Sequence, residues 1–127
     1  MTVQPQVLVI DDDADMRMLM GALLEHLGAR VDVAGAAEEI DLVKLQSTDL
    51  ILLDLVMPTG VYATCLQRLI DSGTRAKVCL LSGSSAQALS QECARIDACG
   101  LQTTQPITKP ARVDALAALL ATLDHAP

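Results

Sequence analysis

The chain has 127 residues, which is enough for one domain that buries a hydrophobic core without disulfide bonds or a structural metal. Its hydrophobic content of 51% excludes an acidic disordered chain, because such chains are poor in apolar residues. Lys and Arg number 9 against 16 Asp and Glu, and the net charge of -7 argues against direct binding to nucleic acid or to an anionic membrane. One tyrosine is the only aromatic residue, so a platform for stacking bases is also absent.

The cysteines and the chain's N-terminal sequence bear on its compartment. Cys65, Cys79, Cys93 and Cys99 lie far apart with no Cys-x-x-Cys pair, which favours reduced thiols in a cytosolic protein over zinc sites or disulfides. No stretch is long and apolar enough to span a bilayer, and the N-terminus lacks the features of a signal peptide. We therefore expect one cytoplasmic domain over residues 1–127, without membrane association.

The first predicted elements are a strand, a helix and a second strand. The apolar run VLVI leads into three aspartates and predicts a strand over residues 7–11, buried on both faces. Asp13 suits the N-cap of the following helix, and Gly28 suits its end. The alternating segment 29–34 (ARVDVA) predicts a more exposed second strand. The expected buried face of the helix consists of Met16, Leu19, Met20, Leu23, Leu24 and Leu27.

The middle of the chain predicts a helix, a buried strand and another helix. The first helix is expected over residues 36–45. The run LILL ends in an aspartate and predicts the clearest strand of the chain, over residues 49–54. A loop over residues 57–60 (MPTG) then leads into a helix over residues 61–71, which ends near Gly73.

The last part of the chain completes the alternation. Residues 77–82 (KVCLLS) predict a fourth strand, and Ser84 or Ser85 is expected to cap a helix that runs to about residue 98. A weaker, polar fifth strand is expected over residues 100–104. Pro110 is expected to open the last helix, whose apolar stripe consists of Val113, Leu116, Leu119, Leu120 and Leu123. Five strand–helix repeats indicate an α/β fold with a parallel sheet between helices.

Several polar side chains are expected at one edge of this sheet, because parallel strands all finish at the same edge. Asp11, Asp12 and Asp54 follow the first and third strands. Ser82 ends the fourth strand, and Lys109 comes just after the fifth. Each residue alone has a plain structural explanation, such as helix capping, a turn hydroxyl or a surface cation. Their joint arrival at one edge indicates a functional site.

The chemistry of this set points to a divalent cation and a phosphoryl group. Carboxylate oxygens are ligands that Mg²⁺ prefers, and Asp11, Asp12 and Asp54 can supply them. Magnesium together with Lys109 would hold the charge of a transferring phosphoryl group. Asp54 is then a candidate nucleophile that forms an aspartyl phosphate, and Ser82 can donate a hydrogen bond to a phosphoryl oxygen.

Four segments of the sequence occur in an order that resembles a known family. VLVIDDDADMR, LILLDLVMP, LLSG and ITKP resemble the receiver domain of bacterial two-component response regulators, over essentially the whole chain. The resemblance implies a flavodoxin-like (βα)5 three-layer sandwich with a five-stranded parallel sheet in the order 2-1-3-4-5. It implies phosphorylation by a histidine kinase or phosphotransfer protein, read by an effector, an appended output domain or a second copy of the chain. It implies catalysis only of the domain's own phosphoryl transfer and dephosphorylation.

The resemblance also implies a role for individual residues. Asp54 would accept the phosphoryl group, Ser82 would be the switch hydroxyl, and Lys109 would contact the phosphate. Pro110 would follow a cis peptide bond, as is common in the family. The implied magnesium ligands are Asp11, Asp12, Asp54 and the backbone carbonyl of Val56.

Three features depart from the family's usual pattern. The loop after Pro58 reaches Gly60 early, so the third helix is expected to start early or to sit differently. Pro106 stands where the family often has the tyrosine or phenylalanine whose rotation reports phosphorylation. Val56 and Ser84 occupy positions where many members carry polar or acidic side chains that tune dephosphorylation.

Two other functions stay open at this point. A magnesium-dependent phosphohydrolase also forms an aspartyl phosphate, but it usually has a second acid where this chain has Val56, and the chain is too short for a substrate cap. A pseudo-receiver would keep the fold as a docking or dimerisation module. Pro106 and the short loop favour it, whereas the complete set of polar residues disfavours it. Magnesium affinity separates a pseudo-receiver from a receiver that is phosphorylated, because a degenerate site should bind Mg²⁺ poorly. A nucleotide-binding function is excluded because no Gly-rich loop follows a strand.

Overall fold

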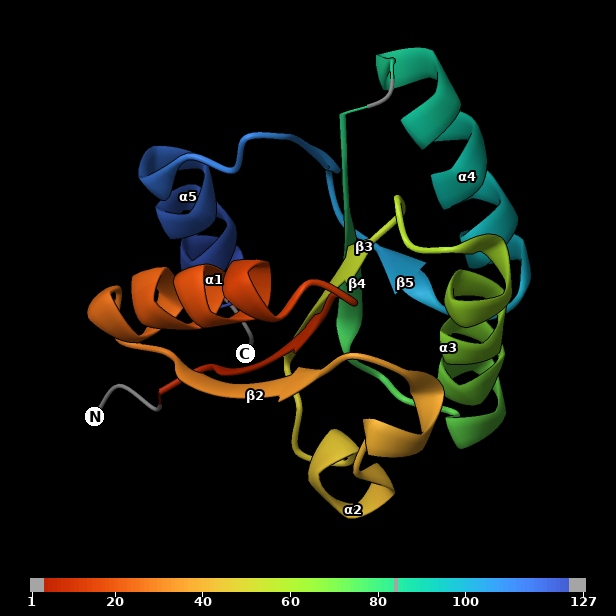
Figure 1. Ribbon diagram of the computed structural model, residues 1–127, viewed down its shortest axis with the longest axis horizontal. Coiled ribbons are helices and arrows are strands. Elements are labelled where there is room, and N and C mark those ends of the chain that lie inside the picture. The colour runs from red at the N-terminus through yellow and green to blue at the C-terminus, as the bar shows by residue number, and fades with distance from the viewer. Residues whose placement is uncertain (1–3, 84, 124–127) are drawn as a thin grey trace.

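The computed structural model describes residues 4–83 and 85–123, and its centre is a parallel β-sheet (Figure 1). Neighbouring strands follow the order β2-β1-β3-β4-β5, and a short further strand, β6, also pairs with β4. This order and the parallel pairing confirm the predicted flavodoxin-like α/β fold. The strands are β1 (Gln6–Ile10), β2 (Arg30–Ala34), β3 (Leu50–Asp54), β4 (Lys77–Ser82), β5 (Gln102–Thr103) and β6 (Ile107–Thr108).

Helices cover both faces of the sheet and make three layers. Figure 1 shows α1 and α5 on one side and α2, α3 and α4 on the other. Among the helices of the described ranges, none is long and apolar enough to cross a membrane. The helices are α1 (Ala14–His26), the 3₁₀ turn η1 (Ala37–Glu39), α2 (Leu42–Leu45), α3 (Thr59–Ser72), α4 (Ala86–Ala98) and α5 (Val113–Leu123).

The sheet separates two hydrophobic cores, because successive side chains of a strand point to opposite faces. In β3, Leu50 and Leu52 pack with buried residues of α1 and α5, whereas Ile51 and Leu53 pack with those of α3 and α4. Every residue of β3 is buried, including Asp54 at its end. The strand that carries this aspartate is therefore held from both sides.

Helix α1 begins and ends as predicted, but its buried face is narrower. The Asp13 carboxylate caps it by accepting hydrogen bonds from the Asp15 and Met16 N–H groups at 2.9 and 3.4 Å. Met20 and Leu24 are buried, whereas Leu19 is 52% exposed, so its placement in the core was wrong. Leu19 lies about 100° around the helix axis from Met20, beyond the face that meets the sheet.

The single helix predicted over residues 36–45 is wrong, because the segment forms two short turns instead. Ile40 and Asp41 have extended backbones that interrupt the helical path between η1 and α2. The Asp41 carboxylate then accepts hydrogen bonds from the Val43 and Lys44 N–H groups at 3.0 and 3.3 Å. An aspartate that caps a new helix thus competes with continuation of the first one.

Helices α3 and α4 sit close to their predicted places. Helix α3 begins at Thr59, as the early glycine suggested, and ends at Gly73, whose φ of 68° suits a residue without Cβ. Ser85 caps α4 by accepting a hydrogen bond from the Ala88 N–H at 3.2 Å, while Ser84 lies outside the described residues. The Tyr62 hydroxyl on α3 donates a hydrogen bond to Glu92 on α4 at 2.6 Å.

The fifth strand is interrupted, and the segment after it differs from the prediction. Strand β5 falls within the predicted range, but the chain pairs with β4 again at β6, after an irregular stretch that includes Pro106. The Lys109–Pro110 peptide bond is cis, as the resemblance implied. The chain stays non-helical until Val113, so the start of α5 at Pro110 was wrong. Leu116, Leu119 and Leu120 are buried as predicted, whereas Val113 is exposed.

The cysteines are free thiols, in agreement with the sequence analysis. Cys65, Cys79 and Cys93 are buried, and Cys99 is exposed. Burial raises the pKa of Cys79 to about 11, so this thiol stays protonated at neutral pH.

Two leucine truncations in α1 test this assignment of the core. We expect Leu24→Ala to lower the free energy of unfolding by about 2–5 kcal/mol, because it opens a cavity beside the sheet. Leu19→Ala, the matched control in the same helix, is expected to change it by no more than about 0.5 kcal/mol. Urea unfolding followed by circular dichroism measures both. Equal losses in the two variants would contradict the packing described here.

Candidate functional site

Three aspartates meet at the C-terminal edge of the sheet. Asp11 follows β1, Asp54 ends β3, and these two strands are adjacent. One carboxylate oxygen from each of Asp11, Asp12 and Asp54 lies within 4.8 Å of the others. Asp11 and Asp54 are each 3% exposed, whereas Asp12 is open to solvent. The structure thus brings together the carboxylates that the sequence analysis placed at one edge.

Two groups hold the Asp54 carboxylate in place. The Lys109 ammonium lies 3.1 Å from its Oδ1 atom, and the Lys109 side chain is only 25% exposed. The Val56 N–H donates a hydrogen bond to the same oxygen at 2.9 Å. The position of Lys109 is set in turn by its own N–H, which donates to the Ser82 carbonyl at 2.9 Å.

Ser82 is at the end of β4, the strand next to β3, and is fully buried. In the pairing of β3 with β4, Asp54 lies opposite Leu81, the residue before Ser82. Strand order and pairing therefore place Ser82 one residue beyond the level of Asp54, on the neighbouring strand. The Val56 side chain is exposed, and a metal-binding role of the Val56 carbonyl stays a prediction.

The site carries more negative than positive charge, and the pKa of Asp11 is raised there. Burial is the largest cause that raises the pKa of Asp11, and the charge of Asp54 and a hydrogen bond with it raise this pKa further. The Asp13 N–H, which donates to Asp11 Oδ1 at 2.9 Å, and the charge of Lys109 lower it. The net effect is a raised pKa, so the protein alone does not fully compensate the charge of Asp11. A bound cation would do so.

One residue that contacts this cluster was not predicted from the sequence. Arg17 lies in α1, and its Nη1 atom donates a hydrogen bond to the backbone carbonyl of Asp11 at 2.7 Å. Its place six residues after Asp11, on the second turn of a helix that starts beside the site, was the available signal. That spacing alone did not reveal which group the arginine contacts.

A groove of about 410 Å³ lies beside Pro106, where the family often has an aromatic side chain. Ile107, Pro110 and Leu119 contribute to its walls, so it is lined by both α5 and the segment around Lys109. A proline ring cannot rotate about χ1 as a tyrosine does. The residue before β6 therefore cannot report on the site by a rotamer change.

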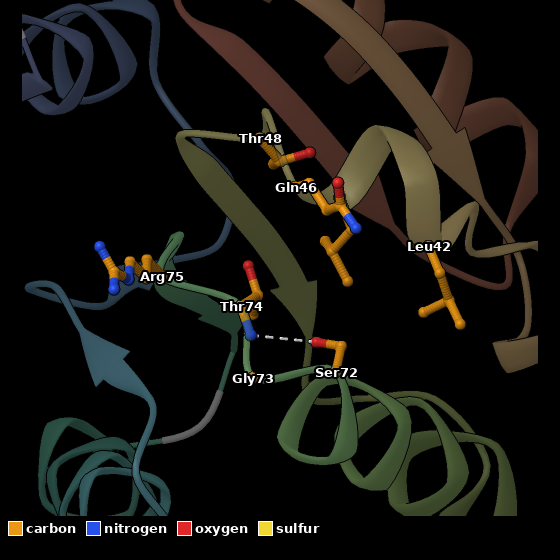
Figure 2. A pocket seen from close by; sticks show the side chains of 8 residues that line it. Leu42, Gln46, Thr48, Ser72, Gly73, Thr74 and Arg75 are labelled. Carbon is orange, nitrogen blue, oxygen red and sulfur yellow. Dashed lines mark hydrogen bonds between the residues drawn. The ribbon is translucent and has the colours of Figure 1, made fainter.

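A cavity of similar size lies at the opposite edge of the sheet (Figure 2). Thr48 precedes β3 and Thr74 precedes β4, so the cavity is at the N-terminal ends of strands whose other ends carry Asp54 and Ser82. Its wall includes a hydrogen bond from the Thr74 N–H to the Ser72 hydroxyl at 3.1 Å. In the part of the chain that the structure describes, no cluster of metal-ligating side chains lies there.

Comparison with known proteins identifies the family. Residues 7–121 match the model of the response regulator receiver domain. The chain belongs to this family. Over 118 residues it is 30% identical to the chemotaxis protein CheY of Halobacterium salinarum, and the match covers 91% of this chain and 96% of the relative. It is 29% identical over 111 residues to the CheY protein of Bacillus subtilis, covering 86% and 88% of the two chains.

Solved structures support the same fold. A response regulator from Colwellia psychrerythraea superposes with a TM-score of 0.77 at 24% identity, covering 96% of this chain and 98% of that one. The chemotaxis protein CheY4 of Vibrio cholerae gives a TM-score of 0.73 at 22% identity, covering 95% and 99%. The chain is thus a receiver domain of a CheY-like response regulator. Receiver domains bind Mg²⁺ at an acidic pocket and interact with histidine kinases and output domains, and this chain has the aspartate cluster.

The raised pKa of Asp11 predicts a stability difference that depends on pH. In EDTA at neutral pH, we expect Asp11→Asn to raise the Tm, because it removes a buried charge beside Asp54 and its amide oxygen can still accept the Asp13 N–H. The pKa of Asp11 is higher in the folded protein than the value of 3.8 expected for the unfolded chain. The stability of the unsubstituted protein therefore falls as the pH rises through the window between 3.8 and the raised pKa of folded Asp11. The advantage of Asp11→Asn should thus be largest above the window and vanish below it.

Thermal unfolding over a series of pH values measures this difference. Asp15→Asn is the matched control, because it removes one charge from an exposed position in the first turn of α1. It is expected to leave the Tm unchanged or slightly lower, since an acidic residue there favours the helix dipole. An Asp11→Asn variant no more stable than the unsubstituted protein at neutral pH would refute the electrostatic account.

Proposed function

We propose that this receiver domain accepts a phosphoryl group on Asp54 from the phosphohistidine of a sensor kinase or phosphotransfer protein. The observation that carries this proposal is the setting of Asp54. It is a buried carboxylate, held by the Val56 N–H and the Lys109 ammonium, with two further carboxylates close by. A buried acidic cluster with a lysine is expensive for a purely structural purpose, because its like charges repel each other.

The donor set fits Mg²⁺. Asp11, Asp12 and Asp54 would hold the ion, together with the backbone carbonyl of Val56, and all of these donors are the oxygen atoms that a hard cation requires. Burial and the charge of Asp54 raise the pKa of Asp11, and a bound cation would stabilise its ionised form. When bound, Mg²⁺ neutralises charge on the carboxylates and on the phosphoryl oxygens.

The transfer itself exchanges one bond for another. An oxygen of the Asp54 carboxylate forms a bond to phosphorus while the P–N bond of the phosphohistidine breaks. The imidazole nitrogen keeps the electron pair of that bond. If the other ring nitrogen carries a proton, the histidine leaves neutral, and if it does not, the leaving nitrogen takes up a proton from water. The Lys109 ammonium, already 3.1 Å from Asp54, stabilises charge on the transferred group. Ser82 donates a hydrogen bond to it once it is attached.

The same residues account for the loss of the phosphoryl group. Water attacks phosphorus, the bond to the Asp54 oxygen breaks, and inorganic phosphate leaves with the carboxylate restored. In this proposal the domain catalyses only its own phosphorylation and dephosphorylation. The exposed side chain at position 56 is an apolar valine, which cannot hydrogen-bond to the attacking water. We therefore expect slow hydrolysis. Ser84, the other position that tunes this step in the family, lies outside the described residues.

Residues 1–127 act as one receiver domain in the cytoplasm. Its partners are the kinase, an effector or an appended output domain, and a second copy of the chain.

In the proposed output, phosphorylation changes the position of β4 and of the segment that follows β5. Phosphorylation draws Ser82 toward the new phosphoryl oxygens. The Lys109 N–H donates to the Ser82 carbonyl, so movement there shifts the chain around Pro106 directly, without an aromatic rotamer.

Intact-mass spectrometry after incubation with phosphoramidate tests the proposal. Phosphoramidate carries the same P–N bond as phosphohistidine. We expect one phosphoryl group per chain in Mg²⁺ and none in EDTA. Asp54→Asn should abolish the modification, and Lys109→Met should slow it by roughly 100-fold, in line with the loss of one charge-stabilising group. Asp15→Asn is the control that should react normally. Absence of the modification, or equal labelling of Asp54→Asn, would exclude the proposed function.

A further inference from the structure

The Arg17 hydrogen bond acts on one peptide unit at the site. The guanidinium donates from Nη1 to the Asp11 carbonyl at 2.7 Å. That carbonyl belongs to the peptide that joins Asp11 to Asp12, the two neighbouring carboxylates of the cluster. Rotation of this peptide would change the direction of both side chains relative to each other. The arginine therefore contacts the group on which their relative orientation depends.

The backbone of Asp11 is held on both sides. Its N–H donates to the Ala34 carbonyl of β2 at 3.1 Å, and its carbonyl accepts from Arg17. Asp11 is only 3% exposed, so water has little access to the residue. Removal of the guanidinium would leave a buried acceptor without its protein donor. The peptide would then turn to find another partner.

Gly35 provides the space that the guanidinium occupies. A Cβ atom added to Gly35 would lie 2.6 Å from Arg17 Nη1 and 3.2 Å from Cζ, which is too close for either atom to stay. The φ angle of Gly35 is not positive, so a Cβ here would conflict with the position of the guanidinium and not with the backbone conformation. Its N–H donates to Glu39 Oε1 at 2.9 Å, which holds the loop under the arginine.

Arg17 acts through geometry, because its charge has no close acidic partner. Among the residues that the structure describes, no carboxylate lies within ion-pair distance of its guanidinium. The charges that shift the pKa of Asp11 belong to Asp54 and Lys109. Arg17 is therefore not a counterion of the cluster.

We propose that Arg17, seated over Gly35, is a positioning residue that orients the Asp11 and Asp12 carboxylates for Mg²⁺. This role rests on the proposed function, in which these carboxylates hold the ion. A group that orients metal ligands affects the affinity for the metal more than the step that follows binding, and its loss typically weakens affinity by about 10–100-fold.

Isothermal titration calorimetry with MgCl₂ tests the role on the whole chain. Arg17→Met removes the donor. Gly35→Ala keeps the arginine but places a methyl group where the guanidinium lies, and the φ angle of Gly35 is compatible with alanine. We expect each variant to raise the Kd for Mg²⁺ about tenfold. The double variant should be no weaker than either single variant, because both act on one contact. Labelling by phosphoramidate should return to the normal rate at saturating Mg²⁺.

Two matched variants control for the substitutions themselves. Arg75→Met lies at the opposite edge of the sheet, and Gly60→Ala adds a Cβ that meets nothing within 4 Å. Both should bind Mg²⁺ normally, and circular dichroism should show that all variants are folded. An unchanged Kd in folded Arg17→Met, or additive losses in the double variant, would overturn the positioning role alone. Failure of the unsubstituted chain to bind Mg²⁺ would instead overturn the proposed function, and the role with it.

Discussion

The mutual repulsion of buried carboxylates is the constraint around which this receiver domain is built. Asp11 and Asp54 are nearly inaccessible to solvent, and they lie at the ends of adjacent parallel strands. Lys109 lies beside Asp54, whereas burial first and then the charge of Asp54 raise the pKa of Asp11. The fold tolerates this cost because β1 and β3 are buried between two hydrophobic cores, which supply the compensating stability.

Much of the fold was predictable because it depends on local chemistry and simple geometry. The apolar runs that end in Asp11 and Asp54 predicted two buried strands, and parallel pairing brings their ends together. The Asp13 cap and the left-handed Gly73 set helix ends in the same way, through a single residue each. The site followed from these elements, since its carboxylates, Ser82 and Lys109 all lie at strand ends.

The errors arose where two local signals compete and where contacts between distant segments decide the structure. Asp41 ends one helical turn by capping another, and the pattern of residues 36–45 does not distinguish this from a continuous helix. The second pairing of the fifth strand, at β6, depends on contacts with β4 that no short segment encodes. Leu19 has an apolar side chain but lies beyond the face that meets the sheet. Arg17 was missed because its partner is a backbone carbonyl, which leaves no mark in the sequence.

Pro106 and Arg17 lie outside the carboxylate cluster and bear on different steps of the proposed function. In the proposed function, Pro106 changes how a shift at the site reaches the surface, while Asp54 keeps its contacts with Lys109 and the Val56 N–H. Arg17 contacts the peptide between the Asp11 and Asp12 carboxylates, and its guanidinium lies against Gly35. In the proposed function, Mg²⁺ binding and output therefore depend on separate parts of this chain, on opposite sides of Asp54 in the sequence.

The most direct test of the account is the effect of Mg²⁺ on thermal stability. We expect the Tm to rise with MgCl₂ concentration, and the free energy of unfolding to increase by about 2.7 kcal/mol when free Mg²⁺ is 100 times its Kd. NaCl of equal ionic strength should not reproduce this rise, and Asp54→Asn should weaken it strongly. A Tm that responds equally to both salts, or equally in Asp54→Asn, would contradict the claim that the buried carboxylates form a magnesium site.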